Sequence, residues 1–404
     1  MKIKDYQELI EKCSYCNFCQ ATCPVYLEDL RESHLARARV NLIQAALCEK
    51  TLPVSRRFKE ILGRCLLCTS CTLTCPGGLP IDEIVAAARN EVYRGKRLNP
   101  IKRYLMHKIM SQRGVSGVVG KAQSLLQAMG WNLQEIPRPA DRPLADRYPD
   151  RIAPEGEVRA RVAYFVGCAT NALYPDTGEA VLGVLKLNGI EVILPQGLVC
   201  CGVPSLAEGD LDTVLEMART NIPLLAGQEV DAIITDCTSC GLMFRKKILK
   251  VLPQDDPLRP QAEAVAEKVW EVTDYLTHIG LTAKPDPLAE KFTYHLPCHR
   301  GWTPTLDEAP RSLLGQVPEA ELVEMENPGT CCGAGGGFFL ENRELSQSIR
   351  SHKLEEIAGT GVKVVLTQCP ACRGYLSAAL SDGRVIHPIS LLAQAYRLEP
   401  PEKE

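Results

Sequence analysis

The chain has 404 residues, of which 45% are hydrophobic and 24% are charged. This composition is ordinary for a folded protein of two or three domains, and it excludes a disordered one. The formal net charge of −3 removes the main electrostatic argument for nucleic-acid binding, since a phosphate-binding protein normally carries a basic excess. We find neither an apolar run near the roughly 18 residues of a membrane span nor the apolar core of a signal peptide, so we expect a cytoplasmic protein.

Nineteen cysteines in a cytoplasmic chain require a chemical explanation, because a reducing compartment does not maintain disulfides. Metal ligation is the obvious alternative. Eight of these cysteines form two runs with the same spacing, CSYCNFCQATCP at 13–24 and CLLCTSCTLTCP at 65–76. This spacing is the bacterial ferredoxin pattern, and the chain contains two copies of it.

The ferredoxin pattern assigns the eight cysteines to two cubane clusters. Three cysteines at intervals of three wrap one face of a cubane, while the fourth, turned away at the proline, ligates the other cluster. The sequence thus predicts one [4Fe–4S] cluster on Cys13, Cys16, Cys19 and Cys75, and a second on Cys65, Cys68, Cys71 and Cys23. A pair of zinc knuckles is the competing interpretation, but zinc gives no reason for a duplicated three-plus-one run that ends in proline.

The periodicity of apolar residues predicts helices around the two runs. One helix is expected over residues 35–47 and another over 81–92, which favours an α-helical ferredoxin domain at 1–100. A further helical stretch at 101–131 has apolar and basic faces and is expected to pack on its own domain. Residues 136–157, rich in proline, are predicted to be a linker, so that 101–157 forms a helical connector and linker. Cys48 belongs to neither run and is expected to be a small buried apolar residue.

From residue 159 onward, short apolar strands alternate with helices. Strands are predicted at 162–166, 191–194 and 231–236, with one helix stopping at Gly189 and another spanning 211–226. Such alternation implies a mainly parallel sheet covered by helices. The cysteines fall at the carboxyl ends of the strands and in the loops that follow, where open α/β sheets place their ligands.

The cysteines of this region occur in two tandem copies of one module, predicted at 158–285 and 286–404. Each copy has a single cysteine, then an adjacent pair followed by glycine, then C-x-x-C. The glycine supplies the backbone freedom that such a turn needs. Matching positions are 130 residues apart for Cys168 and Cys298, 131 for Cys200 and Cys331, and 132 for Cys237 and Cys369.

Other interpretations of these modules explain less. A thioredoxin-type pair at Cys369 and Cys372 leaves the duplication and the other cysteines unexplained. Cys298-His299 lacks the earlier cysteine of a c-type haem site, and Phe338 stands where a dinucleotide fingerprint needs a small residue. Zinc remains an alternative for either module, and with it a scaffold without redox activity.

These residues carry a resemblance that covers nearly the full chain. The two modules resemble the duplicated cysteine-rich CCG domain of the heterodisulfide reductases. The order of two ferredoxin runs followed by two CCG modules resembles the iron–sulfur subunit of glycolate oxidase and D-lactate dehydrogenase, and also the D subunit of heterodisulfide reductase. The resemblance implies an N-terminal α-helical two-cluster ferredoxin domain followed by two tandem Rossmann-like α/β CCG modules.

The resemblance also implies the cofactors of the modules. In heterodisulfide reductases, five-cysteine modules of this form hold non-cubane [4Fe–4S] clusters, so one or two further iron–sulfur clusters are expected. Carried over, the ligands would be Cys168, Cys200, Cys201, Cys237 and Cys240 for a third cluster, and Cys298, Cys331, Cys332, Cys369 and Cys372 for a fourth. Members of the glycolate oxidase branch can have an incomplete first module, whereas this one is complete.

Iron–sulfur clusters move single electrons, so oxidation of a 2-hydroxy acid needs a flavin or nicotinamide site, and we see no phosphate-binding glycine loop. The chain is therefore expected to be the electron-transfer subunit of a membrane-associated glycolate or D-lactate dehydrogenase. It would take electrons from a flavoprotein partner and pass them toward quinone or another acceptor, with any contact to the inner face of the membrane made through partners. The alternative is a catalytic subunit that reduces a disulfide at a CCG-bound cluster.

No catalytic residue is assigned from the sequence. His295 and His299 flank Cys298, and the matching residues of the first module are Phe165 and Ala169. Either histidine could donate a hydrogen bond to a cluster sulfur or pass a proton. An ordinary structural histidine is the competing interpretation for both.

Overall fold

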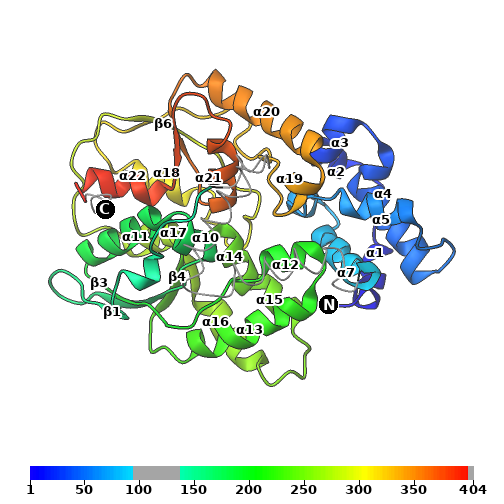
Figure 1. The fold of residues 1–404 in the computed structure, drawn as a ribbon, viewed down its shortest axis with the longest axis horizontal. Coiled ribbons are helices and arrows are strands. Elements are labelled where there is room, and N and C mark those ends of the chain that lie inside the picture. Colours follow the sequence, from blue (N-terminus) through cyan, green and yellow to red (C-terminus); the bar gives the residue numbers. More distant parts are fainter. Residues whose placement is uncertain (94–136, 399–404) are drawn as a thin grey trace.

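A computed structural model describes residues 1–93 and 137–398 (Figure 1). The helix predicted over 101–131 lies outside the described residues. In the described residues of the chain, no helix is both long and apolar enough to span a bilayer.

Residues 1–93 form short helices and contain no strand. The elements are η1 (Ile3–Tyr6), α1 (Gln7–Ile10), α2 (Phe18–Thr22), α3 (Pro24–Asp29), η2 (Glu32–His34), α4 (Ala36–Ile43), η3 (Gln44–Cys48), α5 (Arg56–Gly63), α6 (Ser70–Thr74) and α7 (Ile81–Tyr93). The helix predicted over 35–47 appears as α4 continued by the π-helical turn η3, and α7 matches the helix predicted over 81–92. The all-helical prediction for this part of the chain is confirmed.

Local sequence explains where these helices begin and which face they bury. The Ser55 hydroxyl accepts a hydrogen bond from the Phe58 N–H and so caps the start of α5. Phe58, Ile61 and Leu62 then follow at helical spacing and are buried. Helix α7 is buried from Ile81 through Arg89 because it lies between the N-terminal helices and the first α/β module.

The first α/β module is built on a five-stranded sheet in the order β1-β3-β2-β4-β5. The strands are β1 (Arg151–Ile152), β2 (Ala160–Tyr164), β3 (Ile190–Ile193), β4 (Ala232–Thr235) and β5 (Val269–Glu271). All neighbours pair in parallel except β1, which pairs antiparallel with β3. Strand β1 comes from the predicted linker, so this segment adds an edge strand to the sheet rather than only joining two domains.

The second module repeats this topology without the antiparallel edge. Its strands are β6 (Lys291–Tyr294), β7 (Glu321–Leu322), β8 (Val364–Leu366) and β9 (Arg384–Ile386), all parallel and in the order β7-β6-β8-β9. This order corresponds to β3-β2-β4-β5 of the first sheet, so the repeat seen in the cysteines is also a repeat of the chain path. The prediction of parallel sheets covered by helices is confirmed.

Helices cover both faces of the sheets. In the first module they are α10 (Cys168–Ala172), α11 (Pro175–Leu187), α12 (Val203–Glu208), α13 (Leu211–Ala226), α14 (Thr238–Leu242), η5 (Met243–Lys247), α15 (Ile248–Val251), α16 (Arg259–Lys268) and α17 (Val272–Ile279). In the second they are α18 (Ala309–Leu314), α19 (Phe338–Glu341), α20 (Arg343–Gly359), α21 (Pro370–Ser377) and α22 (Pro388–Ala395).

The two modules share one apolar core. Side chains alternate along β2, so Ala163 faces the core beneath α13 and α16, while Val162 and Tyr164 face the opposite core. The core that contains Val162 and Tyr164 also contains Phe292 and Tyr294 of β6, so this is the core that the two modules share. Helix α11 of the first module packs on α22 of the second. In Figure 1 the N-terminal helices lie at the right, beside α12 of one module and α19 and α20 of the other. All three parts therefore meet at the carboxyl ends of the strands.

Candidate metal centres

The structure gathers the eight ferredoxin-type cysteines into two small pockets. One pocket is lined by Cys13, Cys16, Cys19 and Cys75. The other is lined by Cys65, Cys68, Cys71 and Cys23. Each pocket thus combines three cysteines of one run with the proline-turn cysteine of the other run, as the sequence predicts. We call these sets the outer and the inner tetrad.

Backbone conformation explains how each run curls around its pocket. Tyr15 and Asn17 have φ of 56° and 66°, and the matching residues Leu67 and Thr69 have φ of 53° and 58°. A non-glycine residue in this left-handed region costs about 1–2 kcal/mol. Two such residues in each run, at the same two positions, indicate that the loops are held in this shape by what the cysteines bind.

The two tetrads differ in their exposure. Cys16 of the outer tetrad is exposed, and its neighbours Tyr15 and Phe18 are 51% and 59% exposed. Cys23 of the inner tetrad is buried, and Cys68 also lines the cavity described below. The outer tetrad is therefore the one that an external redox partner can approach.

The cysteines of the first α/β module form one continuous group of thiols, here called the first pentad. Its members are Cys168, Cys200, Cys201, Cys240 and Cys237, in the order in which neighbouring thiols interact. The Sγ atoms of Cys168 and Cys200 are 3.5 Å apart. Hydrogen bonds from Cys200 and Cys240 lower the pKa of Cys201 to about 6, although burial opposes this shift.

The second pentad repeats the arrangement. Its members interact in the matching order Cys298, Cys331, Cys332, Cys372 and Cys369. The Sγ atoms of Cys332 and Cys372 are 3.3 Å apart. Hydrogen bonds from Cys331 and Cys372 hold the pKa of Cys332 well below its usual range, and a hydrogen bond from Cys372 lowers the pKa of Cys369 to about 7.

Both pentads open onto one cavity of ≈ 180 Å³ at the carboxyl ends of the strands. Its lining includes all ten pentad cysteines, together with Cys68 of the inner tetrad. Cys68 packs against the cluster of buried side chains that contains Cys331, and the Cys331 thiol is the first cause that raises the pKa of Cys68. The inner tetrad and the second pentad are therefore in contact.

A glycine makes the turn after each cysteine pair. Gly202 has φ of 95° and Gly333 has φ of 88°, a region that residues with a side chain rarely adopt. At Gly333 a Cβ atom would lie 2.6 Å from the Ser346 carbonyl oxygen. The predicted need for glycine after the pairs is confirmed by these two conformations.

Gly333→Ala is expected to displace the second pentad, because the added methyl group cannot fit against backbone and the φ is unfavourable. We expect a loss of at least about 2 kcal/mol of stability and of the iron bound by this module. Gly336→Ala is the matched control, since Gly336 also has positive φ (62°) but nothing lies within 4 Å of its Cβ position. Thermal midpoints and iron contents that are equal in the two variants would contradict the assignment.

His299 joins three parts of the chain. Its Nε2 donates to the Leu67 carbonyl at 3.0 Å, and its Nδ1 accepts from the Ser239 hydroxyl at 2.8 Å. Beside it, the Thr69 hydroxyl donates to the Cys298 carbonyl at 2.7 Å. Because both ring nitrogens are occupied and burial lowers its pKa, His299 holds the ferredoxin loop against both modules in the neutral form.

His299→Ala is expected to loosen this junction by about 1–3 kcal/mol for each group that it leaves unpaired, the Leu67 carbonyl and the Ser239 hydroxyl. Electron transfer from the inner tetrad to the second pentad should slow, since the loops that carry Cys68 and Cys298 keep the Thr69 hydrogen bond but lose the one made by His299. His299→Gln, which keeps a donor and an acceptor, should recover part of both effects. Stopped-flow reduction of the full chain, with the thermal midpoint, measures them.

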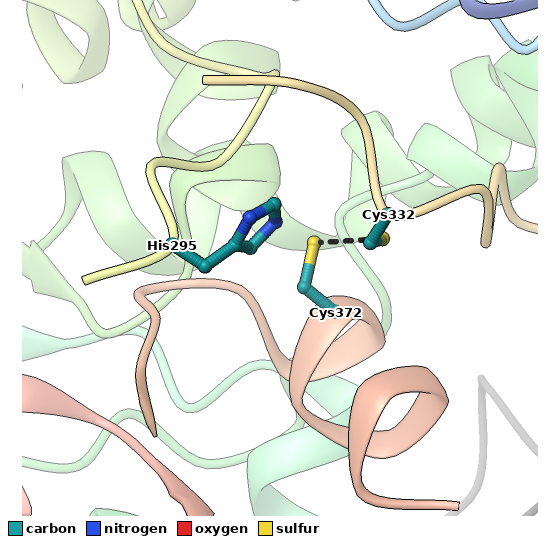
Figure 2. A group of neighbouring side chains, drawn as sticks. All are labelled: His295, Cys332 and Cys372. Atoms are coloured by element: carbon teal, nitrogen blue, oxygen red, sulfur yellow. Dashed lines mark hydrogen bonds between the residues drawn. The ribbon is translucent and has the colours of Figure 1, made fainter. Parts of the chain in front are cut away.

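His295 lies on the other side of Cys298 and is 1% exposed. Burial, reinforced by the nearby charges of Lys353 and Arg300, holds its pKa well below the usual range for histidine. Figure 2 shows its imidazole directed at Cys372 and Cys332 of the second pentad. The structure thus separates the two candidate histidines, with His299 at a domain junction and His295 facing thiols.

Sequence reasoning missed an ionic contact between the ferredoxin part and the first module. The Lys247 Nζ lies 2.5 Å from Asp82 Oδ2 and 2.8 Å from Glu83 Oε1. Burial alone would lower the pKa of Lys247, but the two carboxylates more than offset this and raise it. The partners are more than 160 positions apart in the chain, so no local pattern could have indicated the pair.

The thiols brought together fit the clusters that the sequence predicts. Every predicted ligand lines one of the three pockets, whereas Cys48 ends η3 and lines none of them. Groups of four or five thiols gathered in one pocket are the donor set of iron–sulfur clusters. Bound there, the clusters supply one-electron transfer.

Comparisons with known proteins agree with this chemistry. The model of the "Cysteine-rich domain" (CCG) matches residues 162–245 and 292–377, and that of the "4Fe-4S dicluster domain" matches residues 9–79. The "Probable glycolate oxidase iron-sulfur subunit" of Bacillus subtilis is 26% identical over 97% of this chain and 95% of its own length.

Two further likenesses extend over the same length. The B subunit of fumarate reductase (CoM/CoB) of Methanothermobacter marburgensis is 28% identical over 98% of this chain and 75% of its own length. A crystal structure of a hypothetical protein from Helicobacter pylori has a similar fold, with a TM-score of 0.56 and 11% identity over 98% of this chain and 76% of that one. The chain is therefore a member of the CCG-domain superfamily of iron–sulfur proteins and, with several iron–sulfur clusters, an electron-transfer subunit of an oxidoreductase complex.

Proposed function

We propose that this chain is the iron–sulfur subunit of a membrane-associated, flavin-dependent glycolate or D-lactate dehydrogenase. It accepts electrons from a flavoprotein partner at the outer tetrad and delivers them toward quinone or another acceptor. The observation that carries the proposal is the unbroken series of thiol sites from the protein surface to the shared cavity. The full-length likeness to a probable glycolate oxidase iron–sulfur subunit supports the choice of donor.

The direction of the series follows from exposure. The outer tetrad has its Cys16 side chain and two large side chains, Tyr15 and Phe18, at the surface. The inner tetrad is less exposed, since its Cys23 is buried, and its Cys68 packs against the cluster that contains Cys331 of the second pentad. Electrons that enter at the outer tetrad therefore have a continuous route inward, and the ligand sets of the four sites are those proposed from the sequence.

An acceptor has its own approach to the second pentad. A cleft of ≈ 620 Å³ lies between α3 and α6 on one side and α20 on the other, and it reaches Cys331. Apolar side chains such as Leu27 and Leu73 line it together with charged residues of both signs, among them Arg300, Glu326 and Glu356. A quinone head group, which is flat, apolar and able to accept hydrogen bonds, suits this mixed lining.

Anaerobic reduction by substrate tests the proposal. The chain should co-purify with a flavoprotein, and glycolate or D-lactate should reduce its clusters only when that partner and its flavin are present. The isolated chain without its partner is the control and should remain oxidised. Clusters that stay oxidised in the complex with every 2-hydroxy acid tried would exclude this donor.

A second candidate function rests on the completeness of both pentads. Two full five-thiolate sites facing one cavity suit the reductive cleavage of a disulfide, which consumes two electrons and two protons and yields two thiols. Prereduced, isolated chain that is reoxidised by a disulfide, with two thiols formed per two electrons lost, would establish it.

A further inference from the structure

We propose that His295 donates a hydrogen bond to a thiolate of the second pentad and thereby raises the reduction potential of that site above that of the first. The inference rests on the proposed assignment of each pentad to a cluster. His295 acts as a positioning and tuning residue, and it is not a sixth ligand.

The backbone fixes the direction of the His295 side chain. His295 follows β6 directly, and its N–H donates to the Leu366 carbonyl of β8 at 2.9 Å, which extends the parallel pairing by one residue. A side chain at the carboxyl end of a central parallel strand points into the ligand edge of the sheet. In Figure 2 the ring accordingly projects from its loop toward the sulfur of Cys372.

Within the described residues, the imidazole of His295 makes no hydrogen bond, and the thiols of Cys332 and Cys372 lie near it. Nδ1 and Nε2 of His295 are both buried, and neither makes a hydrogen bond in the part of the chain that the structure describes. A ring nitrogen, Cys332 Sγ and Cys372 Sγ all lie within 4.8 Å of one another. A buried polar group without a partner is destabilising, so the nearby thiolates are the acceptors that account for its position.

Hydrogen bonding explains the site better than ligation. A metal-bound imidazole almost always donates its other ring N–H to a carboxylate or carbonyl, and the described structure offers His295 none. As a ligand it would leave an N–H group buried and unpaired, which is rare. As a donor to sulfur it leaves only a lone pair unpaired, which folded proteins tolerate more readily.

The first module supplies the internal comparison. Phe165 stands at the matching position, and its N–H donates to the Ile234 carbonyl at 2.8 Å, as His295 does to Leu366. Its ring is fully buried and meets Phe244 edge to face, with centroids 4.7 Å apart. A phenyl ring offers sulfur no N–H donor. At this position the two sites therefore differ by one hydrogen-bond donor.

The difference has a predictable sign. A hydrogen bond to a thiolate stabilises the more negative, reduced state of a cluster and so raises its potential. The second pentad, which touches the inner tetrad through Cys331 and Cys68, would then be the preferred electron acceptor of the two. His295 therefore directs electrons to the module that also borders the cleft.

Exchange of the two residues tests the inference in the full chain. His295→Phe copies the first module, and Phe165→His places a donor in it. EPR-monitored redox titration should show the second-pentad signal shifted to lower potential in His295→Phe, with the tetrad signals unchanged, and the first-pentad signal shifted upward in Phe165→His. His295→Gln, which keeps an N–H donor, should recover part of the loss.

Pulsed EPR on the unaltered protein provides a measurement that does not depend on folding of a variant. Weak coupling to a histidine nitrogen and to one exchangeable proton is expected at the second-pentad signal. An unchanged potential in His295→Phe, no such coupling, or the strong coupling of a directly bound nitrogen would each overturn the inference while leaving the pentad clusters in place. An iron content that accounts only for the two tetrads would overturn both the inference and the cluster assignment on which it rests.

Discussion

Cys23→Ser is expected to remove the cluster of the inner tetrad, and Cys75→Ser that of the outer tetrad. Each change replaces a soft thiolate by a hydroxyl, a poor ligand for iron in such clusters. Each substitution should therefore remove the cluster whose other three ligands come from the other run, because each proline-turn cysteine lines the pocket of that run. Both variants should lose about four irons per chain.

Solvent exposure identifies which cluster is lost. The outer tetrad includes the exposed Cys16, so a soluble paramagnetic ion should speed relaxation of its EPR signal more strongly. That signal should survive in Cys23→Ser and vanish in Cys75→Ser. Cys48→Ser, outside all three pockets, should keep every cluster. Loss of the solvent-sensitive signal in Cys23→Ser would show that each run ligates its own cluster.

Lys247→Met is expected to detach the ferredoxin part from the first module. The change leaves Asp82 and Glu83 buried without their cation, and Lys247 itself is only 8% exposed on its side chain. Removing one partner of a buried ionic contact costs about 3–5 kcal/mol, because the remaining charges stay uncompensated. Tyr6 and Thr72 also donate to these carboxylates, at 3.1 Å and 2.7 Å, but neither carries a positive charge.

Chemical unfolding under anaerobic conditions measures this loss, and limited proteolysis shows whether residues 1–93 are released first. Lys250→Met is the matched control, since Lys250 is an exposed lysine in the adjacent turn of the same helical segment. It should change stability by less than about 0.5 kcal/mol. Equal unfolding midpoints for the two variants would show that the buried contact does not hold the parts together.

Local sequence predicted several elements of the ferredoxin part and of the first α/β module. Helix α13 has the predicted bounds, and strands β2, β3 and β4 lie within two residues of their predicted ends. The helix predicted over 35–47 changes to a π-helical turn at Gln44, and β1 arises in a stretch predicted as linker. Strand β1 forms because residues 151 and 152 pair with Ile193 and Val192 of β3, a contact that local propensity does not encode.

The cysteine spacing by itself predicted the two tetrads, because three cysteines at intervals of three reach one cluster while the fourth is turned toward the other. The members of the two pentads were implied by the resemblance to the CCG domain. Only the tertiary structure decided what these groups face. That the two pentads share a cavity, that Cys68 meets Cys331, that His295 points at sulfur and that Lys247 pairs with Asp82 are contacts between distant positions. Their geometry depends on how three parts of the chain pack around the carboxyl ends of two sheets, which no local pattern of residues encodes.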